Sequence, residues 1–334
     1  MENLTALNQF LETPKRLVLT THHKPDGDAL GSMLGLGHYL GSLGHHINFL
    51  SPSDFPSFLD FLYGTHLILD GSNNIEQAEK ILQQADLLIC LDFNRLERTY
   101  AIESILKNNP KPTFMIDHHL FPEGFHHYSF YDPKASSTAE LVYRFILERD
   151  SAHLITPEIA NCLYTGILTD TGSFQYKSTT PFVHRAIADL LEKGADIQQV
   201  FNEIYCNYPL NRTQFLGYCL YNKLVVLPDF KTAYMAISTD ELREFDIKTG
   251  DTEGLVNYAL GIQGINFASL IIDRKELVKI SFRSVGKFSA QQFALHFDGG
   301  GHFNAAGGKS SLSLEQTVQK FLSILPDYRE QLNY

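Results

Sequence analysis

Short apolar runs alternate with helical patterns through the first half of the chain, and this alternation restricts the possible folds more than any other feature. The pattern predicts strands at Arg16–Thr21, His46–Leu50, Leu87–Leu91 and Thr113–Ile116, and helices at Ala29–Leu43, Ser137–Arg149 and Pro157–Thr169. Strands that alternate with helices are typical of an α/β domain with a doubly wound, mostly parallel sheet. In such sheets ligands bind outside the carboxyl ends of the strands, so functional residues should lie there.

The second half of the chain has a different pattern. With 334 residues the chain is longer than most single cores, which rarely grow beyond about 250–300 residues, so two domains are expected. A helical zone at Pro181–Asn222 is followed by four strand-like segments, at Lys223–Val226, Thr232–Ile237, Phe267–Asp273 and Val278–Arg283. We therefore predict a catalytic domain over residues 1–190, a helical linker over 191–222 and a smaller α+β domain over 223–330.

The net charge restricts the partners. It is −11, from 38 acidic and 27 basic residues, which argues against a protein that coats long nucleic acid, because such proteins need a basic surface. A short phosphorylated substrate is still compatible, since divalent cations can supply local positive charge. Alternatively, the acidity only keeps the protein in solution.

The sequence also indicates a compartment. No apolar stretch approaches the roughly 18 residues that span a membrane, and the N-terminus does not resemble a signal peptide. The four cysteines are scattered without a C-x-x-C pair, and we interpret them as reduced packing residues. We expect a cytoplasmic protein without a membrane partner.

Histidine and aspartate side chains follow three of the predicted strands at the points where the strands end. They are His22, Asp26 and Asp28 after the first strand, Asp92 after the third, and Asp117, His118 and His119 after the fourth. Because the carboxyl ends of parallel strands meet at one edge of a sheet, we expect these side chains in a single crevice.

Asp170 extends this set. An apolar stripe runs from Ile159 to Ile167 on the predicted helix before it, and Asp170 continues that stripe. A carboxylate on a buried stripe is costly unless it is paired or coordinates a metal. The alternative is that Asp170 only caps the following turn at residues 171–173, but the other acids make metal binding the better interpretation.

Six of these residues supply ligands for two divalent cations: His22, Asp26, Asp28, Asp92, His118 and Asp170. One carboxylate could bridge the two ions. Mixed oxygen and nitrogen ligation suits Mn²⁺, with Mg²⁺, Co²⁺ or Zn²⁺ as alternatives. Carboxylates this close to one another repel unless cations lie among them.

The same residues occur in four ordered motifs: H-x-x-P-D-G-D-A-x-G-S at His22–Ser32, L-D at Leu91-Asp92, D-H-H at Asp117–His119 and T-D-T-G at Thr169–Gly172. The sequence resembles the DHH phosphoesterases, which include RecJ-type exonucleases, family II inorganic pyrophosphatases, cyclic-dinucleotide phosphodiesterases and nanoRNases. The three-letter D-H-H string alone would be weak evidence, whereas four motifs in order are specific.

The resemblance implies a role for each ligand: His22 and Asp26 at one metal, Asp28, His118 and Asp170 at the other, and Asp92 between them. It also implies that three residues are catalytic. Besides Asp92 they are Asp117, which would orient a histidine, and His119, which would face the substrate phosphate.

A glycine cluster at Gly299–Gly308 follows an Arg-Ser dipeptide at Arg283-Ser284, and the two segments resemble the DHHA1 substrate-binding domain. Taken alone, the cluster could be a glycine-rich turn before a packed helix. Family II pyrophosphatases carry a different C-terminal domain and RecJ-type enzymes carry additional ones, so the nanoRNase and pAp phosphatase group fits best. This resemblance implies an active site in the cleft between the domains, with substrate contacts from Arg283, Ser284, Gly300, Gly301 and His302.

Two weaker candidates for phosphate contacts are Arg95, just after Asp92, and the run Ser136–Thr138 with Glu140. The serine run could equally be the N-cap of the helix that follows.

We therefore predict a manganese-dependent exoribonuclease and 3′-nucleotide phosphatase that acts on short RNA or on a mononucleotide bisphosphate such as pAp. The alternatives are a cyclic-dinucleotide phosphodiesterase and a catalytically silent nucleotide sensor. An intact set of six ligands argues against the sensor, because sensing alone does not require two metals. The preferred substrate, the direction of cleavage, the physiological metal and the choice between monomer and homodimer stay open.

Overall fold

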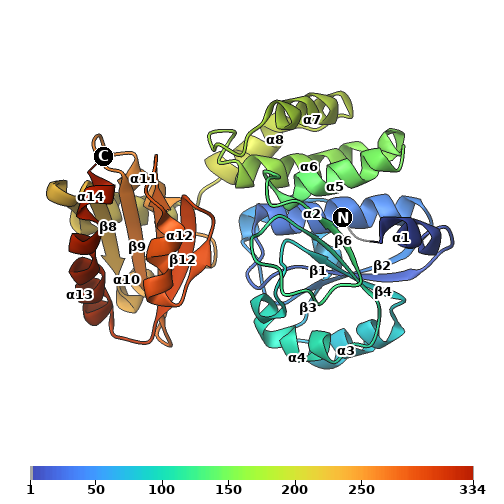
Figure 1. Cartoon of the computed structure of the whole chain (residues 1–334), viewed down its shortest axis with the longest axis horizontal. Helices are drawn as coiled ribbons and strands as arrows, with labels where there is room; N and C mark the ends of the chain where they lie inside the picture. Colours follow the sequence, from blue (N-terminus) through green and yellow to red (C-terminus); the bar gives the residue numbers. More distant parts are fainter. Residues whose placement is uncertain (1–2, 334) are drawn as a thin grey trace. The chain divides into compact units, whose positions relative to one another are not determined.

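The chain forms two compact units in a computed structural model that describes residues 3–333. Unit 1 ends at Asn207 and unit 2 begins at Tyr208 (Figure 1). No helix within residues 3–333 combines the length and the apolar character that crossing a bilayer requires. The domain boundaries inferred from the sequence, after residues 190 and 222, stay a prediction.

Unit 1 is built on a six-stranded sheet in the order β3-β2-β1-β4-β5-β6, in which every pairing is parallel. The strands are β1 Arg16–Thr20, β2 His46–Ser51, β3 Ile68–Asp70, β4 Leu87–Leu91, β5 Thr113–Asp117 and β6 Tyr128–Tyr131. The strand order reverses between β1 and β4, which is where ligands bind in doubly wound sheets. The predicted α/β fold is therefore confirmed, with two short edge strands, β3 and β6, that the sequence pattern did not reveal.

Helices cover both faces of this sheet. The helices of unit 1 are α1 Leu4–Phe10, α2 Gly27–Ser42, α3 Ile75–Gln84, α4 Glu103–Lys107, α5 Thr138–Glu148, α6 Pro157–Asp170, α7 Pro181–Glu192 and α8 Ile197–Phe201, of which α7 and α8 pack against α6. Figure 1 shows α2, α5 and α6 on one side of the sheet and α3 and α4 on the other. Successive side chains of β1 point to opposite faces of the sheet. Leu17 packs in the core with α2, and Val18 packs in the core with α3.

The contact between α2 and α6 is unusually close because α2 carries glycine where it meets α6. A Cβ atom on Gly31 would lie 2.4 Å from the carbonyl oxygen of Cys162 and 3.0 Å from the backbone nitrogen of Gly166. A Cβ atom on Gly27 would lie 2.6 Å from Oγ1 of Thr169. The beginning of α2 therefore lies against the end of α6, which brings Asp28 close to Asp170.

Unit 2 contains a mixed six-stranded sheet in the order β11-β12-β10-β9-β8-β7, in which only β8 and β9 pair in parallel. The strands are β7 Leu224–Leu227, β8 Thr232–Ile237, β9 Phe267–Asp273, β10 Val278–Ser284, β11 Gly300–Gly301 and β12 Ala305–Ser310. The helices are α9 Leu210–Tyr218, α10 Thr239–Glu244, α11 Leu255–Leu260, α12 Ala290–Ala294, α13 Leu314–Ile324 and α14 Arg329–Leu332. A mixed sheet with helices confirms the predicted α+β class of the second domain.

Each face of this second sheet buries its own core. Residues Phe267 and Ile271 of β9 belong to a phenylalanine-rich core, whereas Ala268 and Leu270 of the same strand belong to the core on the opposite face. The phenylalanine-rich core also contains Phe282, next to Arg283 on β10. A rigid strand therefore holds Arg283 in place.

We expect Gly31→Ala to destabilise unit 1. The added methyl group meets backbone atoms of α6 that cannot rotate away, and such overpacking typically costs about 1–3 kcal/mol. Denaturant unfolding should show a lower midpoint than for the wild type.

Gly41→Ala is the matched control on the same helix. Its Cβ atom would meet only Cγ1 of Ile47, at 3.7 Å, so alanine should be neutral or stabilising by about 0.5–1 kcal/mol. Equal midpoints for the two variants would show that the close contact between α2 and α6 does not restrict residue 31.

Candidate metal centre

Three groups of possible metal ligands meet at the carboxyl ends of β1, β4 and β5. They are His22 with Asp26 and Asp92, Asp28 with Asp92 and His118, and Asp92 with Asp117 and His119, and within each group the ligand atoms lie within 4.8 Å of one another. Asp92 belongs to all three groups. It follows β4 directly, is 2% exposed and has a φ of 65°, a strained value for a residue other than glycine.

The first group lies at the beginning of α2. Asp26 is the N-cap, and its Oδ1 atom accepts hydrogen bonds from the backbone nitrogens of Asp28 at 3.0 Å and Ala29 at 3.1 Å. Nδ1 of His22 lies 3.0 Å from the carbonyl oxygen of His23, and its Nε2 atom lies 3.3 Å from Oδ2 of Asp92. When Nδ1 donates to that carbonyl, Nε2 of His22 is the ring nitrogen available to a metal.

The second group depends on the beginning of α5. Asp28 accepts hydrogen bonds from the backbone nitrogens of Thr138 at 2.7 Å and Ala139 at 2.8 Å. The Thr138 hydroxyl donates to Oδ1 of Asp92 at 2.9 Å. A single helix N-terminus therefore positions two carboxylates, and its partial positive charge stabilises them.

This arrangement also explains the serine run. Ser137 is the N-cap of α5 and accepts a hydrogen bond from the backbone nitrogen of Glu140 at 3.0 Å. The Glu140 side chain in turn accepts from the backbone nitrogen of Ser136 at 2.6 Å. The N-cap interpretation is confirmed.

His118 and Asp170 complete the second group. Nε2 of His118 lies 3.4 Å from Oδ2 of Asp170, 3.6 Å from Oδ1 of Asp92 and 3.9 Å from Oδ2 of Asp28. Nδ1 of His118 lies 3.2 Å from the carbonyl oxygen of Ala135, which directs Nε2 toward the three carboxylates. Asp170 is the last residue of α6, so the close contact between α2 and α6 fixes its distance from Asp28.

Charges in the group are strongly coupled. Burial raises the pKa of Asp28 well above its usual value, and the neighbouring carboxylates of Asp92, Asp170 and Asp26 raise it further. Burial also opposes ionisation of Asp92, but the adjacent histidines outweigh burial and lower its pKa. A buried carboxyl group destabilised by other carboxylates is stabilised by divalent cations, and the oxygen and nitrogen donors present here fit two such ions around Asp92.

Asp117 and His119 form a further pair beside the ligands. The fully buried Asp117 accepts two hydrogen bonds from His119, from the backbone nitrogen and from Nδ1, both at 2.9 Å. The carbonyl oxygen of His119 accepts from Nδ2 of Asn94 at 2.6 Å and from the Tyr131 hydroxyl at 3.0 Å. Four hydrogen bonds therefore fix the backbone and the ring of His119.

Arg98 is a residue that the sequence did not single out. Its Nη1 atom donates to the carbonyl oxygen of Asp92 at 3.1 Å. Burial lowers the pKa of His119, and the positive charge of Arg98 lowers it further despite the Asp117 carboxylate. The sequence signal pointed to Arg95 instead, whose exposed side chain pairs with Glu97 at 2.9 Å. Arg98 reaches the carbonyl oxygen of Asp92 because the helical segment Leu96–Ile102 follows β4 closely, and the sequence alone does not show this contact.

In unit 2, the predicted substrate contacts lie on β10 and on the hairpin of β11 and β12. Nη1 of Arg283 donates to the carbonyl oxygen of Phe282 at 3.0 Å. The Ser284 hydroxyl donates to the carbonyl oxygen of Phe288 at 2.7 Å and accepts from Nδ2 of Asn304 at 2.9 Å. Intramolecular hydrogen bonds therefore already engage the hydroxyl of Ser284.

The glycines of the hairpin differ in what the fold requires of them. A Cβ atom on Gly299 would lie 2.0 Å from the carbonyl oxygen of Gly307, and Gly301 has a φ of 139°. At Gly300 a Cβ atom would meet nothing within 4 Å. His302 turns the chain, since its backbone nitrogen donates to the carbonyl oxygen of Ala305 at 2.8 Å. Packing explains Gly299 and Gly301, whereas Gly300 leaves an open backbone surface.

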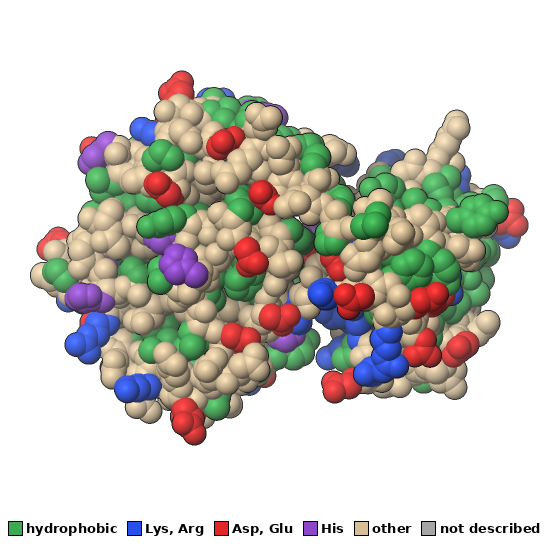
Figure 2. All heavy atoms as spheres, turned by 180° about the vertical axis from the view of Figure 1, so that it is seen from behind, with side chains coloured by type: hydrophobic (Ala, Val, Ile, Leu, Met, Phe, Trp, Pro, Cys, Tyr) green, Lys and Arg blue, Asp and Glu red, His purple; other side chains and the backbone are tan. Residues whose placement is uncertain are grey.

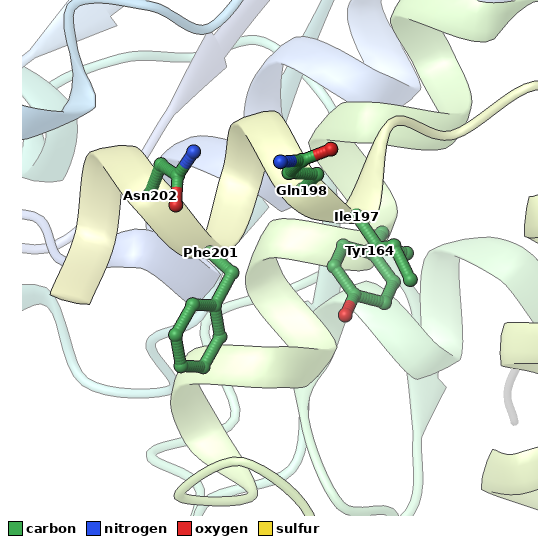
Figure 3. A pocket seen from close by; sticks show the side chains of 5 residues that line it. All are labelled: Tyr164, Ile197, Gln198, Phe201 and Asn202. Carbon is green, nitrogen blue, oxygen red and sulfur yellow. The ribbon is translucent and has the colours of Figure 1, made fainter. Parts of the chain in front are cut away.

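An apolar surface pocket of unit 1 is separate from these ligand groups. It is lined by residues of α6, α8 and the turn after α8: Tyr164, Ile197, Gln198, Phe201 and Asn202 (Figure 3). None of these residues belongs to the ligand groups described above. The candidate metal centre is therefore recognised by its polar side chains and not by an apolar cavity.

Thr138→Val should weaken divalent-cation binding about 10- to 100-fold, the usual effect of removing a group that orients a metal ligand. Valine keeps the shape of threonine but removes the donor to Asp92. Calorimetric titration with Mn²⁺ measures the change.

Thr165→Val is the control, because Thr165 is buried on α6 and its hydroxyl has no hydrogen-bond partner among the described residues. It should bind Mn²⁺ like the wild type. An unchanged affinity in Thr138→Val would show that this hydroxyl does not position Asp92 for a metal.

Comparisons with known proteins identify the family of this chain. The N-terminal domain model of the DHH family matches residues 16–167, and the DHHA1 domain model matches residues 229–330. A Thermus thermophilus protein named bifunctional oligoribonuclease and PAP phosphatase NrnA is 32% identical over 95% of this chain and 90% of its own length. The Bacillus subtilis cyclic-di-AMP phosphodiesterase GdpP is 25% identical over 97% of this chain but only 50% of its own length.

A solved structure extends the similarity to three dimensions. The crystal structure of an exopolyphosphatase-related protein from Bacteroides fragilis matches with a TM-score of 0.93 and 38% identity, covering 99% of this chain and 97% of that chain. Sequence identity above 30% over nearly the full length, together with both domain models, decides the classification. The chain belongs to the DHH family and carries a C-terminal DHHA1 domain.

Proposed function

We propose that the protein hydrolyses short oligoribonucleotides and pAp with the help of two divalent cations, most readily Mn²⁺. The observation that carries this proposal is the sharing of Asp92 between two adjacent ligand groups at the carboxyl ends of the strands. His22 and Asp26 would hold one cation, and Asp28, His118 and Asp170 the other. Mixed carboxylate and imidazole ligation suits Mn²⁺, and Mg²⁺, Co²⁺ or Zn²⁺ could replace it.

When bound, such a pair of cations supplies Lewis acidity toward the phosphoryl oxygens and lowers the pKa of a water molecule that serves as nucleophile. The residues of the chain position the groups that would hold these cations. The Thr138 hydroxyl and the N-terminus of α5 keep the carboxylates of Asp92 and Asp28 in place. They hold these groups before substrate arrives, so no reorganisation is needed during the reaction.

His119 is proposed to contact the phosphate. Its Nδ1 atom is bonded to Asp117, so its Nε2 atom is the one that can approach a substrate. Without substrate, burial and the positive charge of Arg98 lower the pKa of the His119 ring, whereas an anionic phosphate beside Nε2 would raise this pKa. In the imidazolium form the ring would donate from Nε2 to a phosphoryl oxygen and stabilise the charge that develops there.

Unit 2 is proposed to bind the nucleotide. Nε of Arg283 is buried and has no hydrogen-bond partner among the described residues, an arrangement that a phosphate oxygen would complete. Gly300 and Gly301 would offer backbone N–H groups, with His302 beside them. Ser284 would act mainly by holding the loop that leads to Phe288, because its hydroxyl is already engaged.

The size of the substrate is inferred from charge and from the relatives. On the face of unit 1 shown in Figure 2, basic side chains lie scattered among acidic ones, and the residues described there form no continuous basic stripe. With a net charge of −11, this favours short substrates over long nucleic acid. The Thermus thermophilus relative, which is named as an oligoribonuclease and PAP phosphatase, matches this chain over 90% of its own length. The cyclic-di-AMP phosphodiesterase matches over only 50% of its own length.

Asp92→Asn tests the two-cation proposal. Loss of a shared ligand should reduce turnover by more than about 100-fold, the upper range seen for groups that only orient ligands. The assay measures Mn²⁺-dependent hydrolysis of pAp, RNA dinucleotides, a cyclic dinucleotide, pyrophosphate and a long RNA.

Asp70→Asn is the control, because Asp70 ends β3 in the same sheet but belongs to none of the ligand groups described above. It should keep wild-type turnover. Wild-type activity that survives exhaustive chelation would overturn the two-cation proposal, and preference for long RNA would overturn the substrate assignment.

Arg283→Ala tests the role of unit 2. Loss of a charged hydrogen bond should weaken nucleotide binding by about 2–3 kcal/mol and leave cation binding unchanged. The measurement is the ratio of kcat/KM for an RNA dinucleotide and for bis-p-nitrophenyl phosphate, which lacks the sugar and the base. The ratio should fall in Arg283→Ala and stay constant in Arg243→Ala, whose exposed side chain pairs with Asp240. An equal loss on both substrates would contradict the assignment.

A further inference from the structure

Tyr100 combines a strained backbone with an exposed aromatic ring. Its φ of 42° and ψ of −98° interrupt the helical segment Leu96–Ile102, and these angles lie outside the regions open to residues with a side chain. Such strain is costly and persists only when surrounding structure imposes it. The Tyr100 side chain is 60% exposed, so burial of the ring does not offset the cost.

The segment that carries Tyr100 is anchored beside the candidate metal ligands. The backbone nitrogen of His23, the residue after the candidate ligand His22, donates to the carbonyl oxygen of Arg98 at 2.8 Å. Arg98 in turn donates from Nη1 to the carbonyl oxygen of Asp92 at 3.1 Å. Both hydrogen bonds involve Arg98, two residues before Tyr100, so they tie the start of this turn to residues at the candidate ligand groups.

The Tyr100 ring lies against the imidazole of His23, with the ring centroids 4.7 Å apart and the planes tilted by 39°. A similar pair occurs elsewhere in unit 1, since the 57% exposed Tyr63 lies 4.8 Å from the ring of His38. His38 is ten positions beyond Asp28 on α2, or about 15 Å along the helix axis. A tyrosine on a histidine is therefore not itself a sign of function. Tyr100 differs in its strained backbone and in its position beside the ligands.

We propose that Tyr100, supported by His23, forms an aromatic face on which the base of the bound nucleotide stacks. This inference rests on the proposed function, because it places a nucleotide phosphate at the metal centre. Aromatic rings stack on any base through its π-face, so the contact would select for the presence of a base without selecting its identity. The strained turn would hold the ring at the edge of the centre before substrate arrives.

The test compares nucleotides with base-free analogues. The wild type should bind adenosine 5′-monophosphate more tightly than ribose 5-phosphate in equilibrium titrations with Mn²⁺ present. Tyr100→Leu should remove about 5- to 150-fold of the affinity for the nucleotide, the range expected for loss of one base–aromatic stack, and should leave ribose 5-phosphate binding unchanged. Tyr100→Phe should bind like the wild type, because its ring has the same face.

Two further variants keep the result interpretable. Tyr100→Gly should fold without strain, because glycine tolerates positive φ, and it should lose the same affinity as Tyr100→Leu. Tyr63→Leu should leave both affinities unchanged. Equal binding of nucleotide and ribose phosphate by the wild type, or equal losses for both ligands in Tyr100→Leu, would overturn the proposal.

The titration separates this proposal from the proposed function. It requires no turnover, so a wild type that binds the nucleotide through Tyr100 but hydrolyses no phosphoester supports the stacking face and overturns the hydrolase. If the wild type hydrolyses RNA dinucleotides and the Tyr100→Leu variant does so with the same KM, the hydrolase is supported and the stacking face is overturned.

Discussion

The mutual repulsion of four clustered carboxylates is the constraint on which unit 1 depends. Asp26, Asp28, Asp92 and Asp170 lie around two histidines, and burial raises the cost of the charges on Asp28 and Asp92. The fold offsets part of this cost with fixed donors, namely the N-terminus of α5, the Thr138 hydroxyl and the first turn of α2. The remaining charge is what divalent cations would neutralise. The site is therefore held by several elements, because no single loop could keep these carboxylates together.

The strands were predictable wherever they are buried on both faces. The observed bounds of β4, Leu87–Leu91, and of β9, Phe267–Asp273, agree with the predicted bounds because buried strands appear as continuous apolar runs. β3 and β6 are short edge strands and leave no such run. β12, Ala305–Ser310, was read as part of a glycine loop because its residues lack strand propensity, and its strand character comes from pairing with β10.

In the candidate site too, some residues were indicated by local sequence patterns and others were not. The proximity of the candidate ligands could be predicted because each follows an apolar run or continues an apolar stripe, as Asp92 and Asp170 do. Arg98 was not singled out, and Thr138 was singled out only as a possible phosphate contact, because one donates to a backbone carbonyl and the other to a carboxylate 46 positions away. Residues that position a site through the folded backbone leave no mark in local sequence.

The high glycine content of α2 has a consequence for the order of folding. Glycine disfavours isolated helices by about 1 kcal/mol per residue, so a helix that carries Gly27, Gly31, Gly35, Gly37 and Gly41 cannot be stable before it docks on α6. Asp28 and Asp170 come together only in that docking step. A nascent or unfolded chain therefore has no preformed cation site, and any cation that binds would stabilise the folded unit alone by mass action. In a cell, the metal supply would then set how long unit 1 survives proteolysis.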